Sequence, residues 1–189
     1  MTISNHCLTE KEIALLRSLI GKKILSFRHE KFVILPISFG LVGIKTEDGL
    51  YKITSALEDC DLMGEDDEAG FLGVDFASET DFVKDPSSLA PFINSEVGQT
   101  LQDIVLIQQI VDQFEGEEKI STLHYTKGIL FVFETKEYCF TQMHYYFEDI
   151  QIDQGHDLLE KLPSWESEWK DLRGEETYTK CSRTLEHLK

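Results

Sequence analysis

The stretch that most constrains the fold of this chain is residues 128–141, GILFVFETKEYCFT, which has the composition of a β-hairpin. Residues 129–133 and 138–140 are rich in β-branched and aromatic side chains, as strands are. The polar segment 134–137 between them has turn composition. These residues therefore predict two adjacent antiparallel strands.

The expected turn at residues 135–136 fixes the register of this hairpin. It would place Phe131 opposite Phe140 and Phe133 opposite Tyr138. Aromatic cross-strand pairs stabilise a sheet by roughly 0.2–1 kcal/mol each. We therefore expect this face of the hairpin to be part of the core.

The overall composition is that of a globular protein. The chain has 189 residues, 41% of them hydrophobic, which is enough for a single domain over residues 1–189 with a sizeable core. No apolar run approaches the roughly 18 residues of a membrane span. The first residues do not resemble a secretory signal, and the last four are not a lipidation motif. We therefore expect a cytoplasmic protein that does not associate with membranes.

The four cysteines are scattered and form no Cys-x-x-Cys pair, which argues against zinc ribbons and redox motifs. They are Cys7, Cys60, Cys139 and Cys181. Cys139 lies within an apolar strand and is expected to be a small core residue, because catalysis would require a nearby histidine and a lowered pKa. We expect reduced thiols.

The net charge of the chain is strongly negative. It carries 18 basic and 35 acidic residues, a formal net charge of −17. Such a chain repels nucleic-acid phosphates, so a DNA- or RNA-binding role is not expected. An acidic surface can serve solubility alone, or it can attract a basic protein partner over a long range.

Helical signals occur at the beginning, in the middle and at the end of the chain. Thr9 and Glu12 form a capping box that starts a helix, and Gly21 suits its end. A second helix is predicted over residues 89–96. Residues 156–189 are predicted to be a helical tail, which either covers a sheet face or uses its two tryptophans to anchor a partner or ligand. The tail residues with helical spacing are Trp165, Trp169, Leu172, Tyr178, Cys181, Leu185 and Leu188.

Strands are predicted over residues 24–28, 32–37, 41–46, 50–55 and 71–77. Asp48 and Gly49 are typical of a tight turn, which would place Ile44 opposite Ile53. Residues 101–114 fit either a strand or a helical stripe, and we favour the strand. Tyr51-Lys-Ile-Thr and Tyr138-Cys-Phe-Thr follow similar glycine-containing strands. This similarity suggests a duplication with halves at 9–79 and 87–153.

An acidic segment, residues 58–68, contains no base. Self-repulsion among its carboxylates predicts a loop. We expect either a solvated linker or a loop that attracts a basic protein. Its candidate partner-binding residues are Asp59, Asp61, Glu65, Asp66, Asp67 and Glu68.

Motifs that would identify a reaction are missing from the sequence. The acidic segments match a calcium loop poorly, the histidines have no zinc-binding spacing, and there is no nucleophile elbow or phosphate loop. We therefore predict neither a cofactor nor a metal site, and we favour a protein that is not an enzyme.

Together these patterns predict an α+β fold in which antiparallel meanders are flanked by N-terminal, middle and C-terminal helices. For function we favour an acidic module that binds or inhibits a basic protein, as toxin-neutralising immunity proteins do. The alternative is an enzyme or small-ligand-binding protein with a pocket between the aromatic sheet and the C-terminal helices. A third hypothesis is self-association through strand edges, and the pattern does not distinguish a monomer from a dimer.

Overall fold

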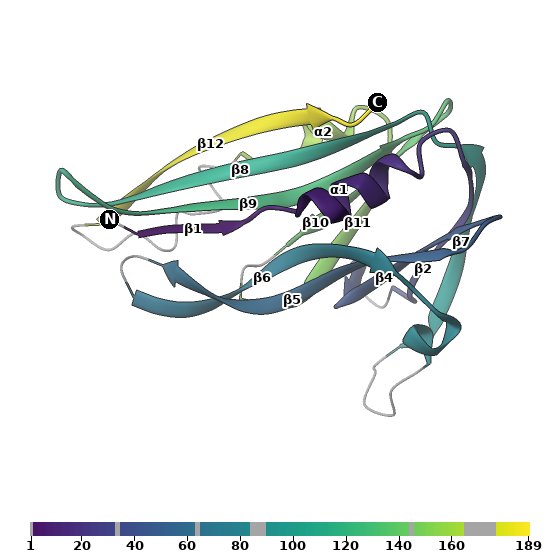
Figure 1. Cartoon of the computed structure of the whole chain (residues 1–189), viewed down its shortest axis with the longest axis horizontal. Helices are drawn as coiled ribbons and strands as arrows, with labels where there is room; N and C mark the ends of the chain where they lie inside the picture. Colours follow the sequence, from purple (N-terminus) through teal and green to yellow (C-terminus); the bar gives the residue numbers. More distant parts are fainter. Residues whose placement is uncertain (1, 33–34, 63–64, 84–89, 144–145, 165–176) are drawn as a thin grey trace.

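A computed structural model describes the whole chain except residues 1, 33–34, 63–64, 84–89, 144–145 and 165–176. The described residues lie mainly in β-strands, which form a seven-stranded sheet and a five-stranded sheet (Figure 1). Each sheet is antiparallel, apart from the parallel pairing of the first strand. Figure 1 shows the first helix between the long strands of one sheet and the hairpin of the other.

The seven-stranded sheet contains most of the second half of the chain. Its order is β12 (Thr177–His187), β8 (Asp103–Glu115), β9 (Glu118–Val132), β10 (Glu137–Gln142), β11 (Asp149–Gly155) and β3 (Ile37–Phe39). The short strand β1 (Thr2–His6) pairs in parallel with the first part of β9. β1 was not expected, because its residues are mostly polar.

The five-stranded sheet contains strands of the first half of the chain and one later strand. Its order is β6 (Glu65–Phe76), β5 (Leu50–Leu62), β4 (Leu41–Thr46), β2 (Lys23–Glu30) and β7 (Phe92–Thr100). The helical elements in the described residues are α1 (Glu10–Arg17), the 3₁₀ turn η1 (Glu79–Phe82) and α2 (Leu158–Lys161). Within these residues, no helix is long and apolar enough to cross a bilayer.

The main core lies between the two sheets and is built around Phe27 of β2. Its ring packs against Phe131 of β9 and Phe140 of β10, with centroid distances of 5.4 and 4.8 Å. Helix α1 adds Leu16 to this core, and the segment after it adds Leu19. The aromatic face predicted from residues 128–141 is therefore buried between the sheets.

The N-terminal helix begins as predicted. Thr9 is its N-cap, its hydroxyl accepts from the backbone N–H of Glu12, and the Glu12 carboxylate accepts from the backbone N–H of Thr9 at 2.8 Å. This reciprocal capping satisfies two backbone donors that a helix start leaves open.

Both predicted hairpins are present, but the register of each differs from the prediction. Phe131 pairs with Tyr138, and Ile44 pairs with Tyr51. The bends lie at residues 134–135 and 47–48, one residue earlier than expected. In the first-half hairpin the hydroxyl of Thr46 accepts from the backbone N–H groups at 48 and 49, a local bond that favours the earlier turn.

The predicted α+β class is wrong, because the fold is predominantly β and only short helices accompany its antiparallel sheets. Residues 92–96, which are part of the predicted middle helix, belong instead to strand β7. This strand pairs with β2. The predicted strand at 101–114 is confirmed as β8. The first two predicted tail residues with helical spacing, Trp165 and Trp169, lie outside the described residues, as does Leu172.

The last part of the predicted helical tail is strand β12. It pairs along its length with β8, from Thr177 opposite Glu115 to His187 opposite Val105. The apolar residues of this segment have a helical spacing. Pairing with β8, however, satisfies the backbone hydrogen bonds of β12 and buries Cys181. Long-range pairing therefore outweighs the local periodicity here.

Candidate functional site

The acidic segment 58–68 is not a loop, because its described residues extend β5 and β6 into a long hairpin. Cys60 pairs with Asp67, and Glu58 pairs with Ala69. Cys60 and Ala69 are buried in a cluster with Leu123 and Tyr125 of β9. Burial of these apolar side chains holds the acidic residues in strands despite their mutual repulsion.

Four carboxylates of this hairpin lie on one face in two directly opposed pairs. Asp59 faces Glu68, and Asp61 faces Asp66. Asp61 is half-buried and the other three are exposed. We call these four residues the acidic face. Asp67 lies on the other side of the hairpin, and the side chain of Glu65 is outside the described part of the structure.

The hairpin twists so that the acidic face points away from the sheet packing. Ile53, near the hairpin base, is buried in the main core, whereas Cys60 is buried against β9. Seven residues separate the two positions, so their side chains leave opposite faces of a regular strand. The face that is buried at the base is therefore exposed at the tip. Two-stranded ribbons twist strongly, and Figure 1 shows β5 and β6 crossing.

Charge compensation on this hairpin is limited. Directly opposed like charges on a sheet are destabilising. Glu58 forms an ion pair with His6, whose Nδ1 lies 2.8 Å from the carboxylate, and the His6 ring stacks on Phe71 at 3.8 Å. Among the described residues, no lysine or arginine forms an ion pair with Asp59, Asp66 or Glu68.

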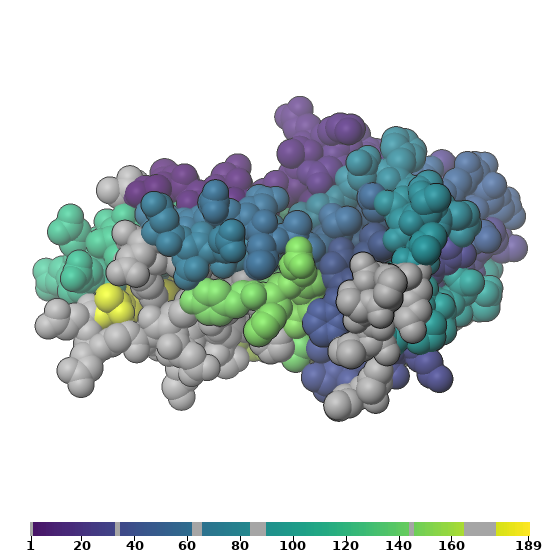
Figure 2. All heavy atoms as spheres, turned by 90° about the horizontal axis from the view of Figure 1, so that it is seen from below, coloured from purple at the N-terminus to yellow at the C-terminus, as the bar shows by residue number. Residues whose placement is uncertain are grey.

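Exposed apolar side chains adjoin the acidic face. Leu57, on the same face, is 41% exposed. A Cβ added at Gly70, its cross-strand partner, would overlap the carbonyl oxygen of Phe147. Phe147 and Tyr146 are themselves 58% and 44% exposed. Figure 2 shows this part of the chain, in light green, against the blue hairpin.

Tyr146 is also electrostatically coupled to the hairpin. Partial burial raises the pKa of its phenol, and the negative charge of Asp67 raises it further. The tyrosine is therefore neutral at physiological pH, with its hydroxyl protonated. Tyr146 thus lies near Asp67, on the other side of the hairpin from the acidic face. We call the acidic face, together with Leu57 and the adjoining Phe147, the hairpin patch.

Cys60 and Cys139 lack the lowered pKa of a nucleophile. All four cysteines are free thiols. Burial, and then the charges of Asp67 and its neighbours, raises the pKa of Cys60 to about 11. Burial likewise raises the pKa of Cys139 to about 12. Both thiols are therefore protonated near neutral pH. Among the described residues, no group of three or more His, Cys, Asp or Glu side chains is arranged to hold a metal ion.

The buried histidine of β2 has a structural role. Nδ1 of His29 lies 2.7 Å from the carbonyl oxygen of Glu30, and Nε2 lies 2.7 Å from the hydroxyl of Ser95. Burial lowers the pKa of His29, although the contact with Glu30 opposes this effect. A neutral imidazole with one donor and one acceptor satisfies both contacts.

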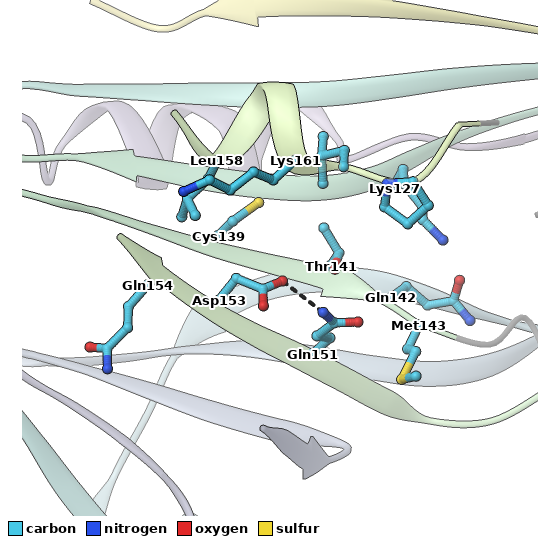
Figure 3. Close-up of a pocket in the computed structure, with 12 residues that line it drawn as sticks. Lys127, Cys139, Thr141, Gln142, Met143, Gln151, Asp153, Gln154, Leu158 and Lys161 are labelled. Atoms are coloured by element: carbon cyan, nitrogen blue, oxygen red, sulfur yellow. Dashed lines mark hydrogen bonds between the residues drawn. The ribbon is translucent and has the colours of Figure 1, made fainter. Parts of the chain in front are cut away.

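A cavity lined by polar groups that include Lys127 lies between β10, β11 and α2 (Figure 3). The alternative hypothesis expected a pocket between the aromatic sheet and the C-terminal helices, but the sequence did not indicate which residues would line it. The lining of the cavity comes from β9, β10, β11 and the α2 region, so no local motif marks it. The weak local signal is Gly128 after Lys127, because a glycine within a strand often accompanies a bulge. No family model, curated protein or solved structure matches this chain.

Proposed function

We propose that the protein is a cytosolic, non-enzymatic module that binds or inhibits a basic protein through the hairpin patch. The observation that carries this proposal is the pairing of Asp59 with Glu68 and of Asp61 with Asp66 on the outer face of a hairpin tip. A basic partner would relieve the repulsion between Asp59 and Glu68. Binding would thus recover free energy that the isolated hairpin loses.

The composition of the hairpin patch supports a protein partner. Protein interfaces combine aromatic and aliphatic anchors with a polar rim, and the exposed side chains of Phe147 and Leu57 would supply the anchors. The acidic face would attract a basic surface before contact. Such attraction acts mainly on the association rate and is screened over roughly 8–10 Å at physiological salt.

Capture from lysate with two charge-matched variants tests this proposal. One variant removes the acidic face through Asp59→Asn, Asp61→Asn, Asp66→Asn and Glu68→Gln. The control removes four exposed carboxylates elsewhere, through Glu47→Gln, Glu96→Gln, Glu134→Gln and Glu160→Gln. Both lose the same charge, so a difference in capture depends on position rather than on net charge.

We expect the native protein and the control to retain the same basic protein at low salt, and the acidic-face variant to lose it. With the purified partner, loss of the acidic face should slow association more than it speeds dissociation. Equal capture by all three proteins, or none at low or moderate salt, would refute the proposal.

A further inference from the structure

A second cavity, of about 370 Å³, lies between the core-facing sides of the two sheets. Its lining comes from β2 and β7 of one sheet, from β10 and β11 of the other, and from Phe32 and Pro36, which lie between β2 and β3. Protein interiors leave few voids larger than a water molecule. A space of this size beside Phe27, at the centre of the main core, is therefore a candidate ligand site, and its volume is in the range of roughly 300–1,000 Å³ that such sites occupy.

Aromatic rings from three segments line this cavity: Phe27 and His29 of β2, Phe32 after β2, and Tyr138 of β10. The rings of His29 and Phe32 are stacked with their centroids 4.4 Å apart. The centroids of Phe27 and Tyr138 are 4.8 Å apart. A planar ring placed among them would gain stacked or edge-to-face contacts, which stabilise a complex beyond the burial of apolar area. The lining therefore favours an aromatic ligand.

Water is a poor occupant of the space between these rings. A buried water typically makes about three hydrogen bonds, and the faces of aromatic rings supply few partners for them. Replacing loosely held water by an aromatic ring is favourable, because the ring needs no hydrogen bond at these faces. A ligand ring is thus a better occupant than solvent.

Hydrogen bonds hold the walls of the cavity in place. The carbonyl oxygen of Pro36 accepts from the backbone N–H of Ile152 at 2.7 Å, which ties the residue before β3 to β11. The hydroxyl of Tyr138 accepts from Nζ of Lys136 at 2.6 Å. Walls that are already ordered lose little conformational freedom when a ligand binds, so less of the interaction free energy is lost.

Ser95 determines which hydrogen bond a ligand can form with this lining. It pairs with Phe27 across β7 and β2, so its side chain lies on the core-facing side of the sheet. The carbonyl oxygen of Glu30 can only accept, so Nδ1 of His29 donates to it, and Nε2 of the neutral ring accepts from the Ser95 hydroxyl. The hydroxyl proton is thus committed to His29. A ligand can bond the Ser95 oxygen only through an N–H or O–H donor.

Gln154 is the β11 side chain that lies on the same face as Tyr138, its cross-strand partner. Figure 3 shows Gln154 and Asp153 on opposite sides of β11. Asp153 is part of both linings, but its carboxylate accepts from Gln151 at 2.8 Å, on the side of the cavity beside α2. The choice of ligand for the cavity between the sheets therefore depends on its rings and on Ser95.

We propose that the cavity between the sheets binds a small planar aromatic molecule that donates a hydrogen bond to Ser95. The ring of the ligand lies among the aromatic side chains, and its N–H or O–H extends the hydrogen-bond chain that runs from Ser95 through His29 to Glu30. The lining shares no residue with the hairpin patch, so this site is independent of the proposed basic partner.

Titration of the full chain, followed by backbone amide NMR signals, tests this proposal. The probes are indole, benzofuran and cyclohexanol. Benzofuran has the shape of indole with an ether oxygen in place of the N–H, and cyclohexanol has a donor but no aromatic ring. We expect indole to shift the signals of Phe32, Ser95 and Gln154 saturably. Benzofuran should bind about three- to tenfold more weakly, the usual effect of one hydrogen bond, and cyclohexanol should also bind more weakly than indole.

Three variants separate the ring contact from the hydrogen bond. Phe32→Ala removes one ring of the lining and should weaken indole by about fivefold or more. Phe39→Ala, the control, removes an exposed ring that is not among the described lining residues and should bind indole like the native protein. Ser95→Cys replaces the oxygen by a weakly accepting sulfur and should reduce the preference for indole over benzofuran about threefold.

Three kinds of result would overturn the proposal. One is an indole affinity that is the same in Phe32→Ala as in Phe39→Ala, because indole would then not lie against the lining. Another is binding of benzofuran or cyclohexanol as tight as that of indole, or an unchanged preference in Ser95→Cys, because the ligand would then not need both the ring and the donor. The last is signal changes centred outside the cavity, or no saturable change at millimolar indole.

Discussion

Phe131 and Phe140 meet edge to face across the β9–β10 ladder, with ring centroids 5.5 Å apart and ring planes at 88°. Their backbones are not direct partners, because Phe131 pairs with Tyr138 and Phe140 pairs with Ile129. The rings are diagonal neighbours on one face. Such neighbours are within reach of aromatic side chains, and this geometry is favoured by the quadrupoles of the rings.

We predict that Phe140→Ala lowers the free energy of unfolding by about 3–5 kcal/mol, because it leaves a cavity in the core around Phe27. Chemical denaturation measures this change. Phe39→Ala is the control, since Phe39 is 57% exposed and its loss should matter far less. A loss within about 0.5 kcal/mol for Phe140→Ala would contradict the packing.

The Phe131–Phe140 pair shows which features of the fold can be predicted from sequence patterns. Composition located both hairpins, and alternation assigned Phe131 and Phe140 to one face. Turn composition placed each bend one residue late, which shifts every cross-strand pair by two. A shift of two preserves the faces, because side chains alternate with a period of two. The core was therefore predictable although the exact partners were not.

The tail and the candidate sites were less predictable, because they depend on contacts between distant segments. Cys181 fits a helical stripe, but its strand is determined by β8 far earlier in the chain. The acidic composition around Asp59 was evident from the sequence. The opposition of Asp59 to Glu68 and of Asp61 to Asp66 was not, because it depends on a hairpin that is held by burial of Cys60 against β9. Lys127 reaches its cavity through a bulge, which no pattern of charges predicts.

The opposed carboxylates should destabilise the isolated protein. We predict that Asp59→Asn combined with Asp66→Asn, one residue from each pair, raises the free energy of unfolding by roughly 0.2–1 kcal/mol per pair. Urea denaturation at low salt measures this gain. The gain should shrink at about 1 M salt, where the screening length is about 3 Å.

Exposed carboxylates elsewhere provide the comparison for this measurement. Glu47→Gln combined with Glu134→Gln changes the charge equally and should alter stability by no more than about 0.5 kcal/mol. If the substitutions at 59 and 66 instead lowered stability, these acids would be making favourable native contacts, and a basic partner would no longer be needed to explain them.

The buried carboxylate at the start of β8 should make stability depend on pH in acid. Burial by itself raises the pKa of Asp103, but the hydrogen bond from His187 at 2.6 Å and the charge of Lys189 outweigh it, so its pKa is lowered. The folded state then binds this proton less readily than the unfolded state. The resulting stabilisation is complete above about pH 4 and is lost as pH falls through the lowered pKa.

We predict that Asp103→Asn removes this part of the acid transition and that His187→Gln moves it to higher pH, because burial of Asp103 is then less opposed. Unfolding free energy measured between about pH 2 and pH 6 tests both variants. His156→Gln, an exposed histidine, is the control. If the unfolding free energies of Asp103→Asn and of the native protein fell equally with decreasing pH, the ion pair between Asp103 and His187 would not contribute to the acid transition.

The packing of Gly70 against the backbone of Phe147 provides the last test. A Cβ at Gly70 would overlap the carbonyl oxygen of Phe147, and backbone can relieve such an overlap only by moving. We predict that Gly70→Ala lowers the free energy of unfolding by about 1–3 kcal/mol, the usual cost of overpacking. It should also displace Phe147 and weaken binding of the basic partner, although no charge is changed.

Gly49→Ala is the matched control, because a Cβ there would meet only the ring of Tyr51 at an ordinary contact distance of 4.0 Å. Denaturation measures stability, and association with the captured partner measures the contribution of the hairpin patch to binding. If Gly70→Ala lowered stability but left binding at the level of Gly49→Ala, Phe147 would not contribute to the interface. The acidic face would then bind without this aromatic anchor, because the substitution leaves all four carboxylates in place.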